Sequence, residues 1–226
     1  MNSLRCALFL FSLATTAVAQ TTHIVDVGVP NNQFTPEFLE IRVGDTVRWV
    51  WVQGRHNVVS DHGAFDSGSS VRPPFDFSVL FDDSLVANFP VPGGQYTYYC
   101  WPHLTQGMVG TVAVLPTLSV SNLVAGSTAT LEVRGCGTTS PHGEPAKVFF
   151  AWSATGPGPT QTPYGDVSLS PPINSLPLVF ASYAEGVATR QVQIPASASG
   201  MAVWIQALVL TPPLARLTQP EALVVG

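Results

Sequence analysis

Hydrophobic and polar residues alternate along much of the chain with a period of two, which is the repeat of a β-strand. The clearest case is the segment 46–52, where Val47, Trp49 and Trp51 share one face and are expected to enter a core. No stretch keeps the 3.6-residue period of an amphipathic helix over three turns. Twenty prolines and nineteen glycines divide the pattern into short pieces. The sequence therefore predicts an all-β protein with many turns.

The strands expected in the first half of the chain are short and separated by turn residues; they cover 22–29, 38–43, 46–52, 95–100 and 108–114. Gly44 and Asp45 form a turn signal, which we expect to close a hairpin between the strands on either side. In the segment 95–100, the period of two places Tyr96, Tyr98 and Cys100 on the inner face.

Pro116 and Thr117 mark a boundary, and a second series of short strands follows it. The clearest of these cover 129–133, 146–151, 176–182, 188–194 and 202–210. The sequence thus predicts two domains, at 20–116 and 117–226, and the second is expected to be another β-sandwich. Its role is open between a scaffold, partner docking and retention at the cell surface.

Residues 1–19 have the features of a signal peptide. Arg5 gives a positive start, residues 6–18 are apolar, and the run ending at Ala19 has the small residues of a cleavage site. The apolar run is shorter than the ~20 residues that a membrane-spanning helix needs. We therefore expect no membrane span, and a mature protein exported to a periplasm or to the outside of the cell.

The chain is acidic, with a pI near 5.4 and no basic cluster, which argues against binding to nucleic acid or to anionic membranes. Residues 20–116 carry nine acidic side chains against four arginines, whereas 117–226 carry five against four basic ones. This excess could steer a positively charged partner or could serve solubility alone.

Two cysteines remain after the signal peptide, which is too few for a disulfide framework. Cys136 has two open interpretations: a small buried apolar residue, or a disulfide to another chain or to Cys100. Cys100 itself stands in a different context, because His103 follows it by three residues and Met108 by eight. A thiolate, an imidazole and a weak thioether suit a copper ion that alternates between Cu(I) and Cu(II). A second imidazole is available from His56, which follows the strand at 46–52.

Three motifs carry a resemblance to a known family: Gly-Asp-Thr-Val-x-Trp from residue 44, His-Asn-Val from residue 56, and Tyr-x-Tyr-x-Cys-x-Pro-His-x-x-x-Gly-Met-x-Gly from residue 96. Over roughly residues 24–115 the chain closely resembles the small blue copper proteins, the plastocyanin, pseudoazurin and amicyanin group of cupredoxins. The resemblance implies a cupredoxin-type Greek-key β-sandwich and one type 1 copper ion. The ligands that it implies are His56, Cys100, His103 and Met108.

Several neighbouring residues are expected to support this site. By resemblance, the Asn57 side chain ties the two ligand loops together and the exposed edge of His103 is the electron port. Pro102 would stiffen the loop and withhold an N–H near the metal, and Gly107 would permit a tight approach before Met108. Tyr99 is either a second electron port or an ordinary surface tyrosine.

Other chemistry is disfavoured by the residues around the motif. Cys100 is flanked by Tyr99 and Trp101 rather than by the histidines that lead to a trinuclear copper cluster, and no His-x-His pair occurs. His62 is expected to be a surface histidine. The segment 71–75 departs from the shorter family pattern and could reshape the docking face.

The sequence therefore predicts an exported protein that is not an enzyme and that transfers single electrons between redox protein partners, such as a cytochrome or an oxidoreductase. One alternative is a copper-handling protein that uses the same site without redox partners. Another is an extracellular structural protein whose copper domain is vestigial.

Overall fold

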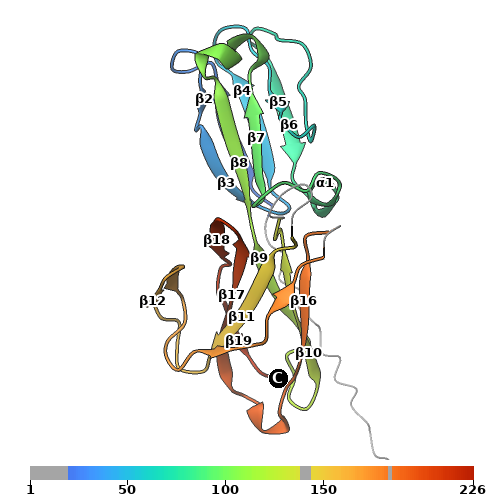
Figure 1. Ribbon diagram of the computed structural model, residues 1–226, viewed down its shortest axis with the longest axis vertical. Coiled ribbons are helices and arrows are strands. Elements are labelled where there is room, and N and C mark those ends of the chain that lie inside the picture. Colours follow the sequence, from blue (N-terminus) through green and yellow to red (C-terminus); the bar gives the residue numbers. More distant parts are fainter. Residues whose placement is uncertain (1–19, 138–143, 183–184) are drawn as a thin grey trace, which may run out of the picture.

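The computed structural model describes residues 20–137, 144–182 and 185–226. It is built almost entirely of β-strands, in two sandwiches stacked end to end (Figure 1), so the predicted all-β class is confirmed. The expected signal peptide at 1–19 lies outside the described residues. Within them, no helix has both the length and the apolar character needed to cross a membrane.

The first sandwich contains, in chain order, β1 (Thr22–Val27), β2 (Phe34–Thr35), β3 (Phe38–Arg42), β4 (Thr46–Trp51), β5 (Val59–Ser60), β6 (Asp76–Leu80), the helix α1 (Asp83–Asn88), β7 (Gln95–Tyr99), the 3-10 helix η1 (Trp101–Gln106) and β8 (Val109–Leu115). One sheet has the order β2-β1-β4-β6 and the other the order β3-β8-β7-β5. The pairs β1–β4 and β3–β8 are parallel, and such pairs require crossover connections between the sheets.

The core of this sandwich confirms the predicted inward faces. Val47 and Trp49 are fully buried and Trp51 nearly so. Tyr98 and Cys100 are likewise inaccessible to solvent. The aromatic rings pack edge to face, as in the pair Trp49–Tyr98 with ring centroids 5.4 Å apart.

The hairpin expected at Gly44 and Asp45 is wrong. A turn is present, with Gly44 at a φ of +99° and the Asp45 N–H donating to the carbonyl oxygen of Arg42. However, β3 and β4 belong to different sheets and pair with β8 and β1 respectively. Turn residues fix a local reversal but not which strands pair, so this turn carries the chain from one sheet to the other.

The second sandwich contains β9 (Thr117–Ser121), β10 (Thr128–Arg134), β11 (Lys147–Ser153), β12 (Thr160–Thr162), β13 (Gly165–Val167), β14 (Asn174–Ser175), β15 (Val179–Phe180), β16 (Ala188–Gln193), the 3-10 helix η2 (Ala196–Ala198), β17 (Ala202–Thr211), β18 (Leu214–Leu217) and β19 (Glu221–Val224). One main sheet has the order β16-β10-β9, and the other the order β14-β11-β17-β18, with β15 added to β11 and β19 to β17. The strands β12 and β13 form a separate two-stranded sheet. A single strand over 176–182 is wrong: β14 and β15 are separate strands, with Pro177 between them, which has no N–H to donate to a ladder.

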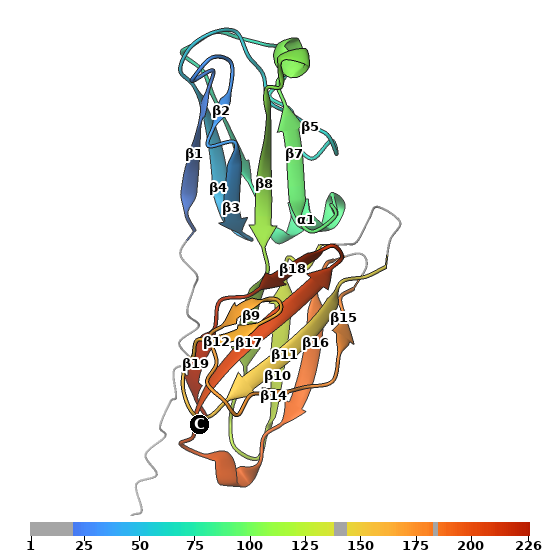
Figure 2. The ribbon, with the colours of Figure 1, turned by 60° about the vertical axis from the view of Figure 1, so that its left-hand side comes forward.

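The two sandwiches meet where β8 ends at Leu115 and β9 begins at Thr117 (Figure 2). Arg216 on β18 reaches across this junction and donates 2.7 Å and 3.1 Å hydrogen bonds to the carbonyl oxygens of Val114 and Cys136. Cys136 is buried and free, which fits its interpretation as a small apolar core residue. Burial raises the pKa of its thiol to about 12.

Candidate metal centre

His56 lies in the connection between β4 and β5, and three hydrogen bonds fix its backbone. The Trp51 indole N–H donates to the His56 carbonyl oxygen at 3.0 Å. The His56 N–H donates a 3.0 Å hydrogen bond to the Val71 carbonyl oxygen, and the Val71 N–H donates a 2.9 Å hydrogen bond to the His56 carbonyl oxygen. Val71 begins the segment 71–75, so these hydrogen bonds brace the His56 loop against the start of this segment.

Cys100 directly follows β7, and η1 follows it. The His103 N–H donates to the Cys100 carbonyl oxygen at 3.1 Å, and the Cys100 N–H donates to the Met108 carbonyl oxygen at 3.0 Å. Gly107 ends η1 with a φ of +79°, a left-handed conformation that glycine adopts without strain. This compact turn carries Cys100, His103 and Met108 on one rigid loop.

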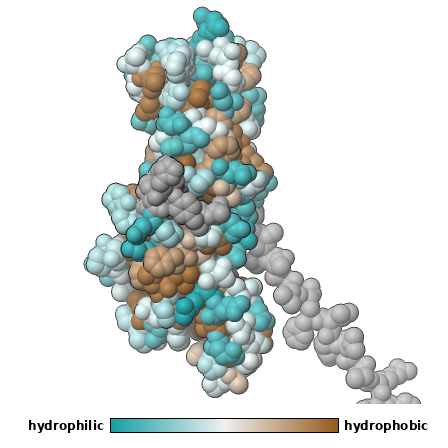
Figure 3. Space-filling model, turned by 45° about the vertical axis from the view of Figure 1, so that its right-hand side comes forward, coloured by the Kyte–Doolittle hydropathy of each residue, from teal (hydrophilic) through white to brown (hydrophobic). Residues whose placement is uncertain are grey.

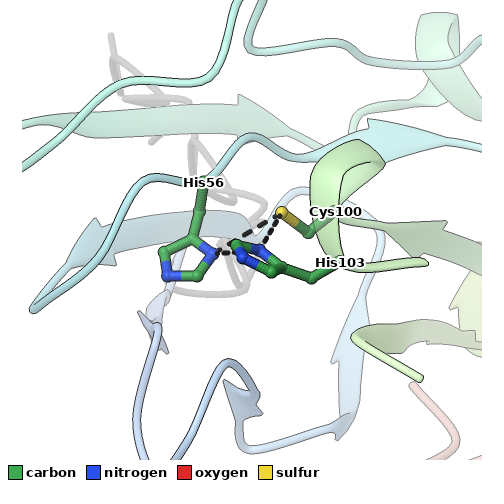
Figure 4. Close-up of side chains that lie close together, drawn as sticks. All are labelled: His56, Cys100 and His103. Atoms are coloured by element: carbon green, nitrogen blue, oxygen red, sulfur yellow. Dashed lines mark hydrogen bonds between the residues drawn. The ribbon is translucent and has the colours of Figure 1, made fainter. Parts of the chain in front are cut away.

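The structure brings three of the four predicted ligands into contact. The Nδ1 atoms of His56 and His103 lie 3.1 Å apart, and the Cys100 sulfur lies 3.5 Å from the first and 3.4 Å from the second. Figure 4 shows the three side chains pointing toward one another. His56 and Cys100 are fully buried and His103 is half-buried.

Two glycines that no sequence motif singles out shape the pocket for the His56 ring. A Cβ atom added at Gly28 or Gly54 would overlap the Nε2 edge of this imidazole. Nε2 is buried and lies near the carbonyl oxygen of Gln53, although the geometry falls short of a hydrogen bond. The ring therefore packs with Nε2 against backbone and Nδ1 toward Cys100.

In the absence of a cation, burial favours the neutral form of the His56 imidazole and the protonated form of the Cys100 thiol. Burial, and then the neighbouring His103, lower the pKa of His56. Burial raises the pKa of the Cys100 thiol, although the backbone N–H groups of Asn57 and His103 act in the opposite direction. A metal ion that binds here must displace the thiol proton, so its affinity depends on pH.

Asn57 joins the two loops, as the resemblance implies. Its side-chain oxygen accepts a 2.9 Å hydrogen bond from the Trp101 N–H, and its side-chain nitrogen donates to the Gly68 carbonyl oxygen at 3.1 Å. Pro102 is exposed at the start of η1.

The remaining predicted residues lie around this cluster. Met108 is 1% exposed and belongs to the same core cluster as Cys100; its role as an axial ligand stays a prediction. Tyr99 is half-buried, with its ring centroid 6.1 Å from that of Trp101. His62 is exposed, and the three-residue cluster of His56, Cys100 and His103 does not include it.

The donor set fits copper. Two imidazoles and one thiolate form the trigonal His₂Cys set to which a weak thioether is added in blue copper sites. The three donor atoms are within 3.5 Å of one another. A single ion with bonds of about 2.0 to 2.3 Å, as for zinc with the same donors, can contact all three. A β-sandwich with this set at one end defines a cupredoxin-type copper-binding protein.

Comparison with known proteins identifies the family. Residues 23–115 match the model of copper binding proteins of the plastocyanin/azurin family. The chain is 36% identical over 107 residues to halocyanin of Natronomonas pharaonis, a match that covers 44% of this chain and 60% of halocyanin. It is 37% identical over 102 residues to plastocyanin of Synechococcus sp. (strain JA-2-3B'a(2-13)), covering 42% of this chain and 75% of that protein. The chain belongs to the plastocyanin/azurin family of copper-binding proteins.

Solved structures with similarity to this chain include the oxidised form of plastocyanin from Dryopteris crassirhizoma. That match has a TM-score of 0.33 and 25% identity, and covers 41% of this chain and 99% of the other. Pseudoazurin from Methylobacterium extorquens AM1 matches with a TM-score of 0.30 and 25% identity, covering 41% of this chain and 74% of the other.

Proposed function

We propose that this protein is an exported electron carrier, in which His56, Cys100, His103 and Met108 hold one type 1 copper ion. When bound, the ion supplies one-electron exchange between Cu(I) and Cu(II). The observation that carries the proposal is the convergence of three buried or half-buried soft donors on a braced β-scaffold.

The chain's own residues supply rigidity and exclusion of water. His56, Cys100 and Met108 are at most 1% exposed, which leaves no approach for a substrate from their side and supports a carrier rather than an enzyme. The hydrogen bond that the Trp51 indole donates to the His56 carbonyl oxygen, and the one that the Trp101 N–H donates to the Asn57 side-chain oxygen, hold the two loops in place. A fixed donor set accepts both oxidation states with little rearrangement, which favours rapid electron exchange.

Access for a partner is proposed at His103. This residue is half-buried, and its loop carries exposed hydrophobic side chains: Trp101 at 69%, Leu104 at 43% and Val109 at 39%. The 3-10 helix η1 lies at the end of the first sandwich that faces away from the second (Figure 1). The second sandwich therefore leaves this end free for a redox protein, for which a cytochrome or an oxidoreductase is proposed.

The test separates an electron carrier from a copper-handling protein. Copper-loaded protein should give reversible voltammetry and exchange electrons with a soluble cytochrome faster than the Trp101→Glu variant does. It should also keep its copper during an hours-long challenge with a chelator. Irreversible voltammetry together with ready transfer of copper to the chelator would reject the carrier function and favour copper handling.

A further inference from the structure

A large apolar cavity lies inside the second sandwich. Its volume is about 400 Å³, whereas natural cores contain few voids larger than a water molecule. An engineered cavity of about 150 Å³ is enough to bind benzene, and small-molecule sites usually fall between about 300 and 1,000 Å³. The cavity therefore has the size of a ligand site rather than of a packing defect.

The cavity runs between the two sheets of this sandwich. Leu131 on β10 and Val192 on β16 line one side, and Phe150 on β11 and Ile205 on β17 line the other. The lining residues that are themselves exposed gather around η2, where they include Gln193, Pro195, Ser197 and Met201. The mouth is therefore at η2, at the end of the molecule away from the first sandwich (Figure 2).

The rim at η2 is held in place by backbone hydrogen bonds. The Gly200 N–H donates to the Val225 carbonyl oxygen at 2.8 Å, and the Val225 N–H donates to the Met201 carbonyl oxygen at 3.0 Å. The Met201 N–H donates to the Ala198 carbonyl oxygen at 3.0 Å. The entrance is thus formed in advance, as is usual for small-molecule sites.

The chemistry of the lining restricts the ligand. None of the described residues that line the cavity is charged. The polar atoms of Gln193 are engaged elsewhere: its oxygen accepts from Thr128, and its nitrogen donates to the carbonyl oxygens of Gly126 and Ser127. A charged ligand group would be buried here without a partner, at a high cost.

We propose that the second sandwich binds one small uncharged molecule through a hydrocarbon chain, which enters between the sheets beside η2. Half of the lining residues carry branched aliphatic side chains, which suit such a chain. Hydrophobic residues also reach the surface of this half of the molecule on the face turned forward in Figure 3.

The experiment uses the mature copper-loaded protein and the uncharged dye N-phenyl-1-naphthylamine, followed by fluorescence. We expect one dye per chain, displaced by 1-hexanol, 1-octanol and 1-decanol with an affinity that rises about fourfold for each added methylene and levels off once the cavity is filled. No dye binding, or no displacement by the alcohols, would overturn the proposal.

Two variants on η2 locate the binding site. Ala198 lines the cavity, whereas Ala196 is exposed on the same 3-10 helix and does not. Ala198→Phe should weaken dye binding at least tenfold by filling the cavity, and Ala196→Phe should leave it unchanged. Equal binding by both variants would place the dye elsewhere and contradict the proposal.

A third variant covers the possibility that Ala198→Phe does not fold. Met201 stands at the mouth and is 39% exposed, so Met201→Trp narrows the entrance with little strain on the core. It should slow dye association and dissociation at least severalfold while the visible spectrum of the copper site is unchanged. Unchanged dye kinetics in this variant would contradict entry beside η2.

Discussion

The Asn57 side-chain oxygen accepts a 2.9 Å hydrogen bond from the backbone N–H of Trp101. Each of these residues is the immediate chain neighbour of a candidate ligand, His56 in one case and Cys100 in the other. The bond therefore connects two loops that are 44 residues apart in sequence. Fixing the ligand loops relative to each other is what allows three donor atoms to face one ion.

Loss of this bond should loosen the site. We expect Asn57→Ala to lower copper affinity by about ten- to a hundredfold, the usual effect of removing a contact that orients ligands. Asn57→Asp keeps the acceptor oxygen and should retain more of the affinity. Competition titration with a chelator measures both, with Asn88→Ala at an exposed position of helix α1 as the control. Equal affinities for Asn57→Ala and the wild type would mean that the bond does not position the ligands.

The two glycines beside His56 should be intolerant of any side chain. Gly54 has a φ of +78°, and a Cβ there would overlap the His56 imidazole. Gly54→Ala should therefore displace the ring and reduce copper affinity by at least about tenfold.

Gly63→Ala is the matched control for this substitution. Gly63 has a similar φ of +72° but no atom within 4 Å of the added Cβ, so it carries the same backbone strain without the overlap. We expect its copper affinity and visible spectrum to equal those of the wild type. A comparable loss of copper binding in both variants would attribute the effect to strain alone.

Asp45 should stabilise the first sandwich in a pH-dependent way. Burial acts to raise the pKa of this carboxyl, but hydrogen bonds from Arg42, His23 and Thr21 outweigh it and the net pKa is lowered. A lowered pKa in the folded state stabilises the fold above the unfolded value of about 3.9, and this contribution disappears as the pH falls through the folded value.

Asp45→Asn should accordingly cost about 1–3 kcal/mol of unfolding free energy at neutral pH, and the difference from the wild type should shrink in acid. Urea denaturation at several pH values between neutral and strongly acidic measures it. Asp76→Asn is the control, because Asp76 pairs with Arg48 where both side chains are about half exposed, and such pairs contribute less than about 1 kcal/mol. A pH-independent loss in Asp45→Asn would contradict this origin of the stability.

Arg216 should couple the two sandwiches. Burial lowers the pKa of its guanidinium to about 10, and the group remains charged at neutral pH with two carbonyl oxygens as partners across the junction. Arg216→Met leaves these oxygens unsatisfied and should cost about 2–4 kcal/mol of unfolding free energy. It should also speed proteolysis between the sandwiches.

Arg134→Ala provides the contrast for Arg216. The ion pair between Arg134 and Asp83 also crosses the junction, but the two side chains are 44% and 59% exposed. The expected loss of unfolding free energy in Arg134→Ala is therefore below about 1 kcal/mol. If Arg134→Ala were the more damaging of the two, the buried hydrogen bonds would not be the main link.

Much of the fold and of the metal site in the first sandwich could be predicted from the sequence, because both depend on patterns within short segments of the chain. The period of two put Trp49, Tyr98 and Cys100 in the core, and the spacing from Cys100 to His103 and Met108 indicated a metal loop. The partners of β3 and β4 could not be predicted from Gly44 and Asp45, because a turn does not specify which strands pair.

Contacts between segments that are distant in the chain could not be predicted from the sequence either. Gly28 and Gly54 are ordinary turn glycines in sequence, and only the folded chain shows that both lie against His56. Similarly, Arg216 carries no motif, and its contact with Val114 joins residues 102 positions apart. The cavity of the second sandwich depends on how its two sheets separate, which the strand pattern alone does not encode.

The most direct test of the copper site is the visible spectrum of the oxidised mature protein, recorded together with its copper content. With one copper per chain we expect an intense thiolate-to-copper absorption, which Cys100→Ser abolishes and Cys136→Ser leaves intact. A colourless protein that carries one Cu(II) with His56, Cys100, His103 and Met108 all in place would contradict the site described here.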